Sequence, residues 1–122
     1  MKIFIAVIVA ILIVILCVYL FLFPPLPLIP EIGRNLSPAF RIAKVEFSNR
    51  VGNAFPTGVP EKEVRTTLLR QGFKIHLAKD GKWYAVFEKA GLPCRLYWMI
   101  SWRSDADGAV KDLSGDYGGW CF

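Results

Sequence analysis

The chain has 122 residues, which is enough for one small domain and no more once an anchoring or targeting segment is set aside. Hydrophobic residues make up 54% of it and the formal net charge is +5. Lys2 is the only charged residue before position 31. The rest of the chain therefore carries 14 of the 15 Lys and Arg residues and all 10 Asp and Glu residues. This mild excess is typical of a solvated basic surface, and it also permits a preference for anionic lipid headgroups or an acidic partner.

An apolar run from Ile3 to Phe23 contains 21 residues without a charge. As a helix it is roughly 31 Å long, which matches the hydrocarbon core of a bilayer. A cleavable signal peptide has a shorter apolar region and then a cleavage site of small residues, and neither feature is present. A lipoprotein signal would need a small residue before Cys17, where Leu16 stands. We therefore expect residues 1–23 to be an uncleaved transmembrane signal anchor in the lipid bilayer.

The orientation of the anchor depends on weaker signals. Lys2 flanks one side, and Arg34 and Arg41 flank the other, so the positive-inside comparison is close to a tie. Cys94 and Cys121 suggest a disulfide, worth roughly 3 to 4 kcal/mol, and hence an oxidising compartment. This favours a bacterial-type inner membrane with the domain in the periplasm. The alternative is a pair of buried free thiols in a domain that faces the cytoplasm.

Residues 24–36 form a proline-rich linker in this interpretation. Its prolines cannot continue a helix, and each restricts the residue before it to extended geometry. Such a segment favours polyproline II and acts as a semi-rigid spacer. A simple stop to the helix is the other interpretation. The four prolines are Pro24, Pro25, Pro27 and Pro30.

Residues 37–122 are expected to form the extracytoplasmic domain, which begins with two helices. Ser37 is a possible N-cap, and a helical stripe follows it, although alternation through Val45 and Phe47 could also form a strand. The stripe consists of Phe40, Ala43, Phe47 and Val51.

The second helix is expected at about 60–71. Thr57 or Gly58 would cap it, and Gly72 would be the left-handed residue after its end. Its inward residues would be Val64, Leu68 and Leu69.

From Phe73 onward the hydrophobic period changes to two. Asp80-Gly81 predicts a hairpin between the first strand and residues 82–89. A long strand follows at 94–103, and a glycine-broken fourth strand at 109–122. The long strand places Trp98 and Trp102, with Leu96 and Ile100, on one face. We therefore predict an α+β fold, with two helices on one face of a sheet of three or four antiparallel strands.

The segment FPTGVPEKEVRTTLLRQGF, residues 55–73, is followed by aromatic-rich hairpins. This arrangement resembles the small two-helix, three-strand envelope domains of the SmpA/OmlA (BamE-like) lipoproteins and the beta-lactamase-inhibitor-protein fold. There, a helix with the pattern Gly-x-x-x-x-x-Val ends in Gly and leads into the sheet. The resemblance covers about residues 37–117, and the anchor here is a helix where those proteins have a lipidated cysteine. It implies a protein-binding domain without catalysis.

Residues with catalytic or ligand-binding potential are sparse. His76 is the only histidine, so a Cys-His pair with Cys94 or Cys121 is the one nucleophilic arrangement available. No zinc spacing or phosphate loop occurs, and Asp105 and Asp107 resemble the start of a calcium loop without its later ligands. Basic and aromatic residues interleave as in nucleic-acid platforms, but a membrane anchor argues against nucleic acid. We expect no enzyme activity, metal or cofactor.

One face of the long strand is the candidate partner surface. Tyr97 and Met99 lie on the face opposite Trp98, between Arg95 and Arg103. If the helices cover the Trp98 face, these side chains are left open for a partner unless the first helix or the tail covers them. We therefore expect an accessory subunit or assembly factor that binds other membrane protein subunits. The alternative is an anchored module that binds a small ligand or envelope polymer by stacking on Trp83, Tyr84 and Trp120.

Overall fold

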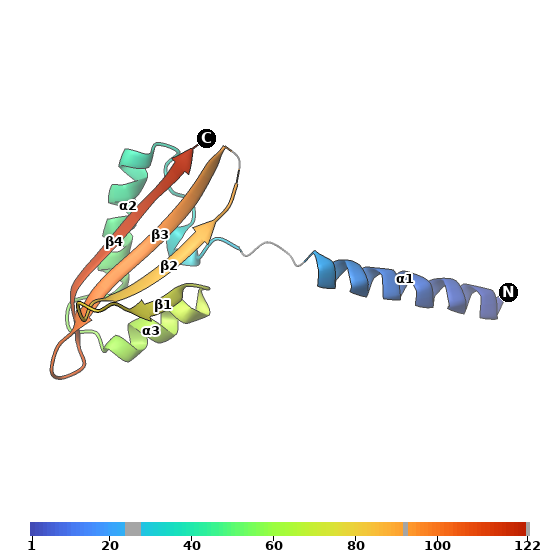
Figure 1. Ribbon diagram of the computed structural model, residues 1–122, viewed down its shortest axis with the longest axis horizontal. Coiled ribbons are helices and arrows are strands. Elements are labelled where there is room, and N and C mark those ends of the chain that lie inside the picture. Colours follow the sequence, from blue (N-terminus) through green and yellow to red (C-terminus); the bar gives the residue numbers. More distant parts are fainter. Residues whose placement is uncertain (24–27, 92, 122) are drawn as a thin grey trace.

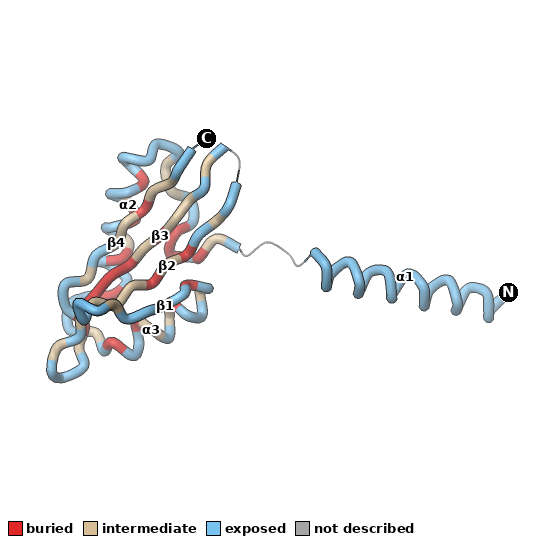
Figure 2. Tube along the Cα trace, viewed as in Figure 1, coloured by how far each residue is buried: buried red, intermediate tan, exposed pale blue. Residues whose placement is uncertain are grey.

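The computed structural model describes residues 1–23, 28–91 and 93–121. Helix α1, Lys2–Leu22, has no buried residue, and it is long and apolar enough to cross a membrane (Figure 2). The remaining elements confirm the predicted α+β fold, with two helices before four strands. They are η1 (Glu31–Gly33), α2 (Phe40–Ala54), α3 (Glu61–Arg70), β1 (Lys74–Leu77), β2 (Trp83–Lys89), β3 (Cys94–Ser104) and β4 (Val110–Cys121).

The four strands form one antiparallel sheet in sequence order, β1-β2-β3-β4. Consecutive strands are joined by hairpins, and the predicted Asp80-Gly81 turn has Gly81 at φ 82°. Figure 1 shows α2 running beside β4 and α3 lying beside β1, in agreement with their contacts. The two edges of the sheet thus each have a helix next to them.

The core lies between the helices and one face of the sheet. Alternate residues of a strand point to opposite faces, and the buried apolar residues of β2 and β3 follow this period. They pack against the buried residues of α2 and α3, which Figure 2 colours red. The core includes Ala43, Phe47, Val51, Val64, Leu68, Ala85, Phe87, Trp98, Ile100 and Trp102.

Helix α2 confirms the helical interpretation of its stripe over the strand alternative. Its start differs from the prediction, because Ala39 is the N-cap residue and makes no side-chain capping bond. The Ser37 hydroxyl instead accepts a hydrogen bond from the Ala39 N–H at 3.3 Å, before the helix begins. Phe40, the first residue of the stripe, is 38% exposed, and its ring centroid lies 5.8 Å from that of Tyr117.

Helix α3 lies where it was predicted, but its start is stabilised differently. Pro60 is the N-cap residue, so neither Thr57 nor Gly58 caps the helix. The Glu61 N–H donates to the Gly108 carbonyl at 2.8 Å, and a β-bridge joins Pro60 to Ala109. The turn between β3 and β4 therefore supplies the acceptor that a side-chain cap would have supplied.

The other end of α3 confirms one prediction and contradicts another. Gly72 has φ +96°, the left-handed geometry expected for the residue that ends the helix. Leu69 was expected to face the core, and it is 55% exposed. Leu68 and Val64 already fill the inward positions, and Leu69 follows Leu68 by about 100° around the helix.

The folded domain begins before residue 37, where the sequence analysis placed its boundary. Pro30 is fully buried, and Ile32 and Gly33 of η1 are buried too. The Ile32 N–H donates to the Gln71 side chain at 3.0 Å, which ties η1 to the end of α3. Ile29, Pro30, Ile32 and Gly33 therefore pack in or against the core and are not part of a spacer, while Glu31 between them is exposed. The polyproline prediction for residues 24–27 falls outside the described residues.

Candidate partner surface on the open sheet face

The face of the sheet opposite α2 and α3, here called the open sheet face, carries the predicted partner residues. Residues paired across antiparallel strands lie on the same face. Tyr97 pairs with Glu88 and Gly118, and Met99 pairs with Val86 and Asp116. The described residues of this face are Lys74, His76, Tyr84, Val86, Glu88, Arg95, Tyr97, Met99, Ser101, Arg103, Lys111, Ser114, Asp116, Gly118 and Trp120.

An aromatic pair occupies one end of the open sheet face. The rings of Tyr97 and Trp120 are 5.6 Å apart, and Trp120 is 61% exposed. Tyr97 lies over Gly118, where an added Cβ would be 2.7 Å from the tyrosine oxygen. The glycine therefore lets the tyrosine ring lie flat on β4 and leaves the indole as the most exposed aromatic group beside it.

Met99 and the two arginines complete the predicted set. Met99 is half-buried at the centre of the face. The Arg95 guanidinium donates to a Glu88 carboxylate oxygen at 2.8 Å, and both side chains are about half exposed. Arg103 donates to the Asp80 carbonyl at 2.9 Å, at the opposite end of β3. Both arginines thus have hydrogen-bond partners within the domain. The open sheet face is therefore characterised by its apolar centre more than by the charge of these arginines.

The three aromatic residues of the ligand-binding alternative do not form one stacking surface. Trp83 lies on the helix side of the sheet, where it stacks on Trp102 at 6.5 Å under the Arg65 guanidinium. Tyr84 and Trp120 share the open sheet face, but they lie opposite Ser101 and Arg95 of β3. Six residues of strand, about 20 Å, separate those positions.

His76 and the acidic turn each make contacts within the domain. His76 is exposed on β1 and stacks on Tyr84 at 5.5 Å. Asp105 Oδ1 accepts backbone hydrogen bonds from Asp107 and Ala109, which accounts for this carboxylate as a turn residue. In the ranges that the structure describes, no three His, Cys, Asp or Glu side chains gather as metal ligands would.

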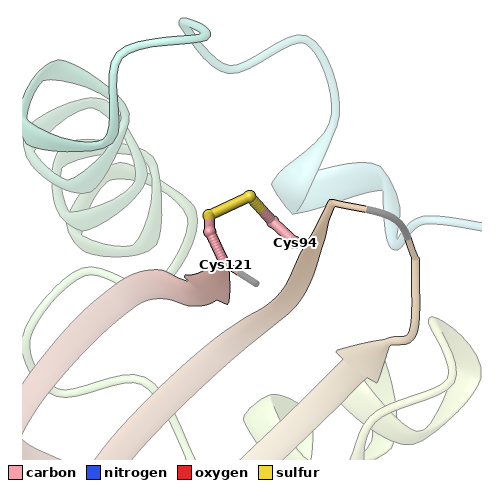
Figure 3. Close-up of a disulfide and its surroundings, with 2 residues drawn as sticks. All are labelled: Cys94 and Cys121. Atoms are coloured by element: carbon pink, nitrogen blue, oxygen red, sulfur yellow. A yellow bond between two sulfur atoms is a disulfide. The ribbon is translucent and has the colours of Figure 1, made fainter.

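Cys94 and Cys121 form the predicted disulfide. They face each other across β3 and β4, with their Cα atoms 4.0 Å apart (Figure 3). The bond joins the first residue of β3 to the last residue of β4. It fixes the strand ends that carry Arg95 and Trp120, so the aromatic pair lies on a covalently closed part of the sheet.

Comparison with known proteins found no match among protein-family models, curated proteins or solved structures. The resemblance to SmpA/OmlA-like envelope domains therefore stays a prediction.

Proposed function

We propose that this chain is a non-catalytic, single-pass membrane protein that serves as an accessory subunit, or an assembly or stability factor, of a larger membrane protein complex. Helix α1 would hold it in a bacterial-type inner membrane, and the domain would lie in the periplasm. The open sheet face would contact the larger partner subunits.

The observation that carries this proposal is the open sheet face itself. Tyr97, Met99 and Trp120 form an apolar area on the side of the sheet away from both domain helices. Aromatic and Met side chains are enriched where proteins bind each other, while charged residues are depleted at the centres of such contacts. The ion pair of Arg95 with Glu88 lies beside this area, as expected for a polar rim.

The anchor and the disulfide support the proposed location. Helix α1 has the length and composition of a membrane span. The Cys94–Cys121 bond is typical of proteins in an oxidising compartment such as the periplasm.

Native gel electrophoresis of membranes solubilised in a mild detergent tests the proposal. We expect the wild-type chain to migrate in a complex much larger than its own mass. Trp120→Ala should release it, since the exposed indole would be lost from the contact. Leu77→Ala is the matched control, because Leu77 is 56% exposed on the helix side of the sheet and should leave the complex intact. A wild-type chain that migrates only as a free monomer would overturn the proposal.

A further inference from the structure

A cleft lies beside the point where the chain enters the domain from the membrane side. It is formed by η1 and the end of α3, and its volume is about 530 Å³. Both apolar and cationic side chains line it. Those that matter here are Leu28, Ile29, Arg34, Arg70 and Phe87.

The length of the connecting segment keeps this cleft close to the bilayer. Helix α1 ends at Leu22, and the chain is already packed against the core at Ile29. Six residues, 23–28, join these points, and a chain of that length spans at most about 20 Å. If α1 is embedded in the membrane as proposed, the cleft must therefore lie within reach of the headgroup layer.

Two arginines in the cleft have the donors that a phosphate group requires. The ion pairs formed within the described residues are Lys44–Asp116, Arg65–Glu61 and Arg95–Glu88, and neither Arg34 nor Arg70 belongs to them. Arg34 uses its Nε to donate to the Ile29 carbonyl at 2.9 Å, which leaves both terminal amino groups. A guanidinium group binds phosphate oxygens in a bidentate manner.

The surroundings of the two arginines hold one more cationic side chain and two carboxylates. Lys74 lines a second cleft that shares Gly72 and Phe87 with the first. Glu31 is the acidic residue that lines the first cleft, and Glu88 is the acidic residue that lines the second. Across the two clefts the cationic side chains Arg34, Arg70 and Lys74 outnumber these two carboxylates, so the adjoining surface favours an anion.

The apolar wall selects a lipid over a free anion. Leu28 is 80% exposed, and Ile29 and Phe87 line the cleft behind it. An apolar side chain left in water beside a membrane gains free energy when it contacts the glycerol and upper acyl region. From these contacts we infer that the cleft binds the phosphate headgroup of an anionic phospholipid in the adjacent leaflet.

Native mass spectrometry of the full-length protein in a neutral maltoside micelle tests this inference. Short-chain phosphatidylglycerol is titrated into the sample, and short-chain phosphatidylcholine and inorganic phosphate are titrated separately. We expect one phosphatidylglycerol to bind per chain, more tightly than phosphatidylcholine. Arg34→Gln with Arg70→Gln should weaken it about 30-fold, the equivalent of about 1 kcal/mol for each arginine.

The matched control removes two charges from the other end of the sheet. Lys79→Gln with Lys111→Gln lowers the net charge equally, and both residues are exposed and outside the cleft. This variant should bind as the wild type does. Arg70→Gln alone is the safeguard against misfolding, since the Arg70 side chain makes no hydrogen bond or ion pair with the residues that the structure describes, and it should weaken binding about fivefold.

Three results would overturn the inference. The first is equal binding of phosphatidylglycerol and phosphatidylcholine. The second is inorganic phosphate that binds as tightly as phosphatidylglycerol. The third is a Lys79/Lys111 control variant that loses as much phosphatidylglycerol affinity as the Arg34/Arg70 variant. None of them bears on whether the chain belongs to a complex, so this test and that of the proposed function can fail separately.

Discussion

Gly33 lies directly against the buried indole of Trp98. An added Cβ would be 2.5 Å from Trp98 Nε1, so Gly33→Ala must displace a rigid ring or η1 itself. We expect the variant to lose about 1 to 3 kcal/mol of unfolding free energy, as is usual for an overpacked core. Urea unfolding of the full-length protein in a neutral micelle, followed by tryptophan fluorescence, measures this loss.

Gly52 provides the matched control for that substitution. It lies within α2, and an added Cβ would have no neighbour within 4 Å. Gly52→Ala should therefore stabilise the domain by about 0.4 to 1 kcal/mol, because the unfolded chain loses conformational freedom. If both alanine variants unfold at the same urea concentration, η1 does not pack on Trp98 as described.

Tyr117 makes the stability of the domain dependent on alkaline pH. Burial raises the pKa of its hydroxyl above the usual value of 10.0. Because the folded-state pKa exceeds that of the unfolded chain, the stabilisation is complete below pH 10 and is lost as pH rises through the folded pKa. We expect the unfolding free energy of the wild type to fall more steeply above pH 10 than that of Tyr117→Phe. Parallel pH profiles for the two proteins would contradict this expectation.

The predicted residues of the partner surface show what side-chain alternation along a single strand can predict and what it cannot. Alternation along β3 was enough to place Tyr97 and Met99 opposite Trp98. Trp120 was not placed on the same face, because the sequence analysis did not use the register between β3 and β4. The signal was available, since placing Cys94 opposite Cys121 also puts Trp120 opposite Arg95. A predicted disulfide between neighbouring strands therefore predicts their register as well.

The elements themselves were predicted well, and their ends less so. Hydrophobic period located α2, α3 and all four strands, because burial of one face determines each of them. The start of α3 was predicted to within a residue, but its cap was not, since the acceptor there is the Gly108 carbonyl, far along the chain. The packing of residues 29–33 against the core was also not predicted, because it depends on residues that are distant in the sequence. Their burial depends on Trp98 and Gln71, and a proline-rich sequence alone gives no sign of either contact.

The disulfide is the main covalent constraint on β3 and β4. Its cysteines are 27 residues apart, and closing a loop of that size contributes about 3 to 4 kcal/mol in the loop-entropy model. We expect Cys94→Ser with Cys121→Ser to lower the unfolding free energy by this amount, measured by urea unfolding. Cys17→Ser is the control and should change nothing, because Cys17 lies in α1 and outside the domain. An unchanged double variant would mean that the bond does not form in solution.

At the scale of the whole molecule, the anchor, the short connection and the domain act together. If α1 spans the membrane as proposed, the short connection to Ile29 would keep the domain next to the bilayer, where its surfaces would meet a limited set of neighbours. The cleft beside η1 would face lipid headgroups, and the open sheet face would be available to a membrane-bound partner. Both proposals require the domain to lie on one defined side of the membrane.

Labelling of introduced cysteines in intact bacterial cells measures that side. Ser48 is exposed on α2, and Ser48→Cys places a reactive thiol in the domain, while Ile3→Cys places one at the other end of α1 and keeps the Lys2 charge that bears on orientation. The native thiols should stay silent, because Cys94 and Cys121 are bonded and Cys17 would lie within the bilayer. With a periplasmic domain, a membrane-impermeant maleimide should label Ser48→Cys in intact cells and Ile3→Cys only after permeabilisation. The reverse pattern would place the domain in the cytoplasm, where a disulfide is not expected to persist.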